Sequence, residues 1–80
     1  MKWIYMRNGH KHYFRSEHPI GGVPKYMSII YRSQLPEDVR DSILAGMRRA
    51  HNNAGLDQEP AVDFDNPEPF DQSVIDAWPG

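Results

Sequence analysis

The chain has 80 residues and no cysteine, and its nine Lys and Arg stand against eleven Asp and Glu. At this length it forms one small domain, and the lack of cysteine excludes disulfides and thiolate metal sites and favours a reducing compartment. No apolar run could span a bilayer and no signal-peptide pattern follows Met1, so the sequence predicts a soluble cytoplasmic protein.

The charges are segregated along the chain. Residues 1–52 carry all nine Lys and Arg and four acids, whereas residues 53–80 carry seven acids and no Lys or Arg. The first part is therefore +5 and the second −7, although the whole chain is only −2. Such segregation acts on partners and association rates rather than on the fold.

Two strands joined by a tight turn are predicted at the N-terminus. Residues 2–7 and 10–15 are rich in aromatic and apolar side chains and flank Asn8-Gly9, the preferred pair for a two-residue type I′ turn. With these two residues at its centre, the turn pairs six side chains that share one face of the ribbon. The pairs are Arg7 with His10, Tyr5 with His12, and Trp3 with Phe14.

A loop, a third strand and a helix follow. Residues 16–24 contain two prolines and two adjacent glycines, which predict a loop, and residues 25–32 predict a strand. Pro36 suits a helix start, and Asn53 or Gly55 suits its end. The helical spacing of apolar residues supports this prediction. These residues are Val39, Ile43, Met47 and Ala50.

The remaining residues differ in composition. Residues 56–80 combine seven acids with four of the seven prolines, which predicts an extended course with at most one short helical turn near Phe70 to Trp78. The sequence therefore predicts an α+β fold in residues 1–55, with a three-stranded antiparallel sheet packed by one helix. Residues 56–80 are predicted to form an acidic, Pro-rich tail.

Catalytic and metal-binding patterns are absent from the sequence. His10 and His12 alternate on a predicted strand, a spacing at which two imidazoles can share a metal, but no further ligands complete a framework. No serine lies in a nucleophile elbow, and Gly21-Gly22 lacks the features of a phosphate-binding loop. We therefore expect a protein that is not an enzyme and that holds neither a metal nor a cofactor.

The predicted hairpin face offers one candidate binding surface. It interleaves aromatic and basic side chains, which is the requirement for stacking bases while neutralising phosphates. Its residues are Trp3, Tyr5, Arg7, His10, His12 and Phe14. The alternative is that this face is buried, since a three-stranded sheet must hide one face under the helix.

The acidic tail offers a second candidate surface. Its carboxylates would attract a basic partner, and the rings between them would anchor in it. The residues are Asp57, Glu59, Asp63, Phe64, Asp65, Glu68, Phe70, Asp71, Asp76 and Trp78. The alternatives are a solubilising appendage or a strap across the chain's own basic surface.

Part of this tail has a counterpart in a known family. Residues 59–70, with their Asp-Phe-Asp and Pro-Phe elements, resemble the acidic tip of bacterial single-stranded-DNA-binding proteins, which recruits repair and replication partners. The resemblance implies a basic partner surface. The family's tip ends the chain at Phe, whereas ten residues follow Phe70 here, so the similarity is one of chemistry.

These observations lead to two expectations of function. The first is a non-enzymatic interaction protein or inhibitor that engages a basic, nucleic-acid-binding partner through its acidic tail. Small DNA mimics and anti-defence proteins of phages and mobile elements have such size and charge, and would act in the host cytoplasm. The second is a small nucleic-acid-binding module that uses the aromatic and basic sheet face.

Overall fold

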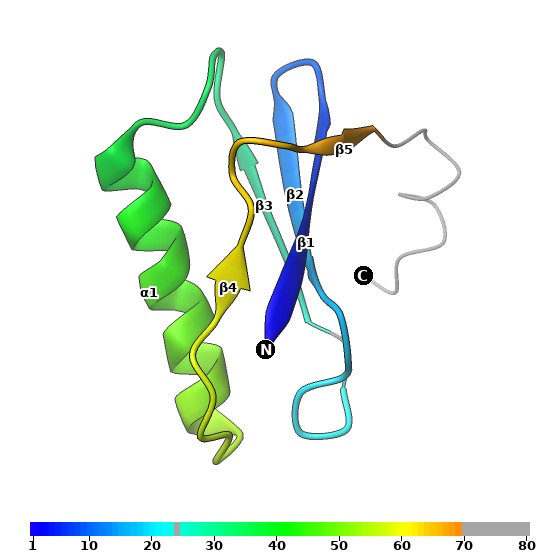
Figure 1. Ribbon diagram of the computed structural model, residues 1–80, viewed down its shortest axis with the longest axis vertical. Helices are drawn as coiled ribbons and strands as arrows, with labels where there is room; N and C mark the ends of the chain where they lie inside the picture. Colours follow the sequence, from blue (N-terminus) through cyan, green and yellow to red (C-terminus); the bar gives the residue numbers. More distant parts are fainter. Residues whose placement is uncertain (24, 70–80) are drawn as a thin grey trace.

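The computed structural model describes residues 1–23 and 25–69, which form an α+β fold of one helix and a mixed sheet. The sheet has the strand order β3-β2-β1-β4, and β5 also pairs with β1. Figure 1 shows two layers, with α1 on one face of the sheet. The elements are β1 (Lys2–Asn8), β2 (Lys11–Ser16), β3 (Tyr26–Ile30), α1 (Glu37–Asn53), β4 (Ala61–Val62) and β5 (Glu68–Pro69).

The hairpin forms as predicted, but its register differs by two residues. Asn8 pairs with Lys11, so Gly9 and His10 form the turn, and Tyr5 lies opposite Phe14 instead of His12. A type I′ turn needs positive φ at both central residues, whereas here Gly9 has φ of 61° and no described non-glycine residue has positive φ. A shift of two preserves the side-chain faces, because side chains alternate with a period of two.

The helix begins and ends close to the predicted residues. Glu37 and Asp38 occupy its first turn, where carboxylates meet the positive end of the helix dipole. At its C-terminus, the Gly55 N–H donates to the Asn52 carbonyl (3.1 Å) and the Leu56 N–H donates to the His51 carbonyl (2.9 Å). This pair of bonds is a Schellman motif, and Gly55 adopts the positive φ (69°) that it requires.

The predicted free acidic tail is not confirmed for the residues that the structure describes. Residues 56–69, here called the strap, return along the molecule, and β4 and β5 pair in parallel with β1. The sheet is therefore mixed and larger than the predicted three antiparallel strands. Prolines are compatible with this arrangement, because an edge strand needs backbone bonds on one side only. The short helical turn predicted near Phe70 to Trp78 lies outside the described residues.

The core lies between the helix and the sheet. It is built on seven buried apolar residues, and Phe64 of the strap packs against them. The buried residues are Trp3, Tyr5, Phe14, Ile20, Leu35, Ile43 and Met47. The helix approaches β3 so closely that a Cβ at Gly46 would lie 2.9 Å from the Met27 Cε atom. A glycine within the helix is thus explained by close packing.

Candidate nucleic-acid interface on the open sheet face

The sheet has two faces. The helix α1 covers the face that the sequence analysis gave as a candidate nucleic-acid-binding surface. Trp3, Tyr5, His12 and Phe14 are at most 5% exposed, because they form the core beneath the helix. His10 lies exposed in the turn, and Arg7 is half-buried, with its Nε donating to the Gly9 carbonyl at 2.9 Å. The six residues therefore do not form a common binding surface.

His12 belongs to a polar network that joins β1, β2 and the residue that follows β3. Its Nε2 lies 3.0 Å from the Tyr31 carbonyl, which can only accept, so Nε2 carries the proton. The Tyr5 hydroxyl then donates to Nδ1 at 2.6 Å. Burial lowers the pKa of His12 below its ordinary value of 6.5, although the bond to Tyr31 opposes this, and burial raises the pKa of Tyr5. Both groups are neutral and hold the sheet together.

His51 forms a second buried network, between β1, the helix and the strap. Its Nδ1 donates to the Gln58 carbonyl at 2.6 Å, and its Nε2 accepts from the Trp3 indole at 3.1 Å. The two rings also stack, with centroids 6.2 Å apart. The strap is thereby tied to the core at its beginning.

The strap places the predicted acidic residues in different environments. Glu59 pairs with Arg48 at 3.0 Å and Asp65 with Arg40 at 3.4 Å. Phe64 lies among the rings of Tyr5 and Phe14, beneath the Arg40 guanidinium. Of the other predicted partner-binding residues, three are exposed and the rest are outside the described chain. Exposed are Asp57, Asp63 and Glu68; Phe70, Asp71, Asp76 and Trp78 lie outside it.

The face opposite α1 combines basic and aromatic side chains. We call it the open face, because no second helix or sheet layer of residues 1–23 and 25–69 covers it (Figure 1). Alternation along the paired strands assigns ten side chains to it. They are Lys2, Ile4, Met6, Asn8, Lys11, Tyr13, Arg15, Tyr26, Ser28 and Ile30. Lys2, Asn8, Lys11, Ser28 and Ile30 are exposed, Met6 is buried, and the others are half-buried.

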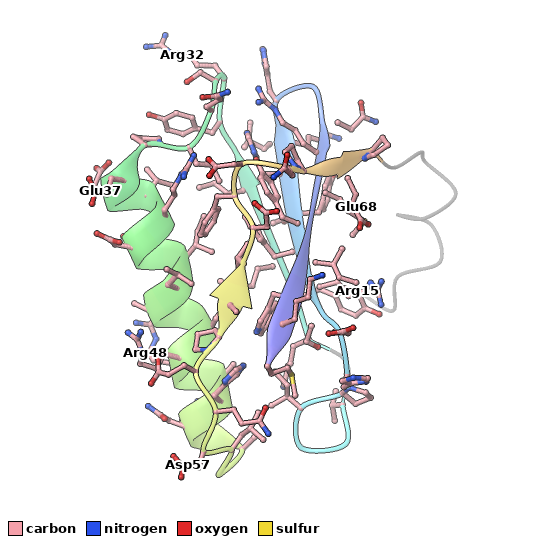
Figure 2. The ribbon with its side chains drawn as sticks, in the orientation of Figure 1. Arg15, Arg32, Glu37, Arg48, Asp57 and Glu68 are labelled. Atoms are coloured by element: carbon pink, nitrogen blue, oxygen red, sulfur yellow. The ribbon has the colours of Figure 1, made fainter. Side chains whose placement is uncertain are left out.

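Strand register determines how these side chains are arranged. Arg15 lies opposite both Ile4 on β1 and Tyr26 on β3, and Tyr13 lies opposite Ser28. Tyr13 and Tyr26 are therefore diagonal neighbours on adjacent strands, within reach of each other. Figure 2 shows Arg15 and Glu68 on the side of the sheet away from the helix. Glu68, on β5 opposite Met6, places a carboxylate at the rim of the open face, which is its edge along β5.

The candidate binding surface that the sequence predicted lies largely on the face of the hairpin that α1 covers. Both faces of the hairpin alternate with the same period and both carry aromatic rings, so the pattern does not say which one packs against α1. One signal was available. Lys2, Lys11 and Arg15 all lie on the face opposite Trp3 and Phe14, and three cations are costly to bury under a helix.

A second basic feature lies between the helix and the loop before β3. A hollow of about 480 Å³ is bordered by Lys25 and Arg49 and has an apolar side formed by Ile20 and Ala50. None of the described residues that line it carries a carboxylate. It could accept an anionic group with an apolar neighbour, but it is separate from the open face.

Other site types find no support in the described residues. No three His, Asp or Glu side chains there gather where they could hold a metal ion. The one helix of this part of the chain is too short and too polar to cross a membrane. Comparison of the chain with protein-family models, curated proteins and solved structures found no match.

Proposed function

We propose that the protein binds single-stranded nucleic acid on the open face. The observation that carries the proposal is the alternation of three cations with two tyrosines on one sheet surface. Lys2, Lys11 and Arg15 can neutralise phosphates, and Tyr13 and Tyr26, which also take part in contacts within the protein, add aromatic rings to the same surface. The side chains of the open face include these three cations and no acid, and Glu68 lies at its rim, which favours an anionic ligand.

The geometry of the sheet favours the binding of single-stranded nucleic acid over the binding of a duplex. The pleated surface presents side chains from three adjacent strands about 4.8 Å apart, so rings and cations form a shallow platform. Unpaired bases can lie on such a platform with their rings parallel to it. Duplex DNA buries its base faces and would present only phosphates and groove edges.

Fluorescence anisotropy with a labelled single-stranded oligonucleotide tests this proposal. At about 50 mM salt the parent should bind, and its affinity should fall steeply as salt rises, because counterions are released. Tyr13→Ala should weaken binding by about 1–3 kcal/mol, and the Lys11→Gln/Arg15→Gln double variant should reduce both affinity and salt dependence.

A matched control separates this surface from overall charge. Arg32→Gln/Arg48→Gln removes the same number of cations from exposed positions outside both the open face and the basic hollow. This variant should keep most of the affinity. The proposal is rejected if the parent does not bind at low salt, or if the control weakens binding as much as the open-face variant.

A second candidate function is an inhibitor that engages a basic protein surface. The exposed carboxylates of Asp57, Asp63 and Glu68 on the strap favour it, since charge–charge attraction speeds encounter with such a partner. Affinity capture from the host should then retain a basic protein that the Asp57→Lys/Glu68→Lys variant loses. Retention by both forms would exclude these carboxylates from the contact.

A further inference from the structure

The two edges of the sheet differ in how well they are protected. On the β1 side, β4 and β5 are two residues long, and prolines at 60, 67 and 69 interrupt the strap. Short strands and prolines are the usual protection against strand pairing. The other edge is β3 (Tyr26–Ile30), which has five residues, no proline and no charge.

The hydrogen-bond pattern shows which groups of β3 point outward. The Tyr31 N–H donates to the His10 carbonyl (2.8 Å), and the Ser16 N–H donates to the Lys25 carbonyl (3.0 Å). In an antiparallel pair, bonded residues alternate, so odd-numbered residues of β3 bond to β2. The backbone N–H and C=O groups of Ser28 and Ile30 therefore point away from the sheet. No hydrogen bond from a described residue reaches them.

We propose that a second copy of the chain pairs with this edge, antiparallel, about a two-fold axis at Ser28. This is the register that pairs all five residues of β3, and it places outward-pointing backbone groups opposite each other. Ser28 would exchange two backbone hydrogen bonds with Ser28 of the second copy. A two-fold interface uses the same patch on both copies, so this self-complementary strand satisfies the symmetry.

Side-chain pairing in this register is favourable on both faces. Ile30, which is 76% exposed, comes to lie opposite Tyr26 of the second copy, and Met27 comes to lie opposite Ile29. Aromatic and β-branched side chains form stabilising cross-strand pairs. The nearest charged residue, Lys25, would lie opposite Tyr31, so no like charges face each other within the pairing.

The consequence for the molecule is a sheet that continues through both copies. Paired residues keep their faces, so both helices lie on one side and both open faces on the other. The proposal is independent of nucleic-acid binding, because it rests on backbone groups and apolar side chains of β3. If both hold, the two open faces form one longer surface.

Disulfide trapping in this cysteine-free chain tests the register directly. In a bonded antiparallel pair the Cα atoms are about 5.5 Å apart, which is within the range that a disulfide spans. Ser28→Cys should therefore cross-link to a covalent dimer under mild oxidation. Ser42→Cys, exposed on α1, is the matched control and should remain monomeric.

Sedimentation of the full chain tests dimerisation without cross-linking. The parent should sediment with twice the monomer mass, and Ile30→Lys should halve it. Val23→Lys, at another exposed apolar residue (53%), should leave the dimer intact. Circular dichroism of each variant confirms that it is folded. The proposal fails if the parent is monomeric at its highest soluble concentration, or if Ser28→Cys cross-links no faster than Ser42→Cys.

Discussion

Two histidines, His12 and His51, are fully buried and each connects elements that are distant in the sequence. In both, one ring nitrogen donates to a backbone carbonyl and the other accepts from an aromatic side chain. The carbonyl thus selects the tautomer, and the aromatic donor is satisfied. Removing one partner would leave the other buried without a hydrogen bond, at a cost of about 1–3 kcal/mol.

Protonation of His12 should destabilise the fold. Because its pKa in the folded state is lowered, the unfolded chain binds the proton more readily. The stabilising contribution is complete above the unfolded pKa of about 6.5 and is lost as the pH falls towards the lower folded value. Chemical denaturation between about pH 8 and pH 5 should show this decline.

The control for this prediction is the slope of stability against pH. His12→Gln should lower stability at every pH and flatten the slope below about pH 6.5. His18→Gln, at an exposed position, is the control for the loss of a histidine. An equal decline in the parent and His12→Gln would assign the acid sensitivity to another group.

Gly46 should tolerate alanine but not larger side chains. Alanine gains about 1 kcal/mol of helix propensity, while its Cβ comes closest to the terminal methyl of the flexible Met27 side chain and makes an ordinary contact with Arg49. Gly46→Ala is expected to change the free energy of unfolding by less than about 1 kcal/mol. Gly46→Val should be clearly destabilising in the same denaturation measurement, and equal stability of the two variants would contradict the close packing.

At the scale of elements, the hairpin shows that the same Asn-Gly pair is compatible with two different turn positions. Asn-Gly favoured a type I′ turn with Asn8 at its centre, but the structure keeps Asn8 in β1 and turns at Gly9 and His10. Only Gly9 then needs positive φ. The Asn-Gly pair therefore predicted the place of the turn but not its register.

Substitutions at these two positions distinguish the turns. Gly9→Val should cost about 1–2 kcal/mol through backbone strain alone, because no atom lies within 4 Å of an added Cβ. Asn8→Val should be nearly neutral, because this exposed residue is in a strand. Thermal unfolding of both variants checks the prediction. Equal losses of stability in the two variants would support a type I′ turn with Asn8 at its centre instead.

The helix was predictable because several signals agree. The apolar spacing gave its buried side, and Pro36, Glu37 and Gly55 gave its ends. Met47→Ala should cost about 2–5 kcal/mol, since the side chain has no exposed surface and little can move to fill the cavity. Arg48→Ala, on the exposed side, should cost much less in the same urea titration. Similar losses of stability in the two variants would contradict the burial of Met47 in the core.

The strands of the strap could not have been found in this way. Two-residue strands are shorter than any periodic pattern, and prolines argue against a central strand. Periodicity alone also did not show which face of the hairpin packs against α1, because both sheet faces contain large apolar residues. The cations Lys2, Lys11 and Arg15 on one face were the signal that indicated the uncovered side.

At the scale of the whole molecule, the strap is part of the fold. It completes the second side of β1, ties Gln58 to His51 and inserts Phe64 beside Tyr5 and Phe14. Its acids neutralise Arg40 and Arg48 on the helix. The charge segregation in the sequence is therefore partly cancelled in space, since the acidic segment folds back onto the basic one.

Phe64 should contribute to stability although it comes from the acidic segment. Phe64→Ala is expected to cost about 2 kcal/mol, less than the 3–5 kcal/mol of a fully buried ring, because Phe64 is half-buried. Phe64→Leu should recover part of this loss. A denaturation midpoint unchanged by Phe64→Ala would show that the strap does not pack on the core in solution.

The connection from β3 through α1 to β4 also has a consequence for folding kinetics. β1 lies inside the sheet, and residues 61–69 pair with one of its sides. The hairpin, β3 and the helix can assemble early from local contacts, but the second side of β1 stays unpaired until residues 61–69 are in place. Pairing of such distant segments carries a loop-closure cost that slows folding. Closure of the sheet by the strap is therefore expected to be a late step, after the local elements have formed.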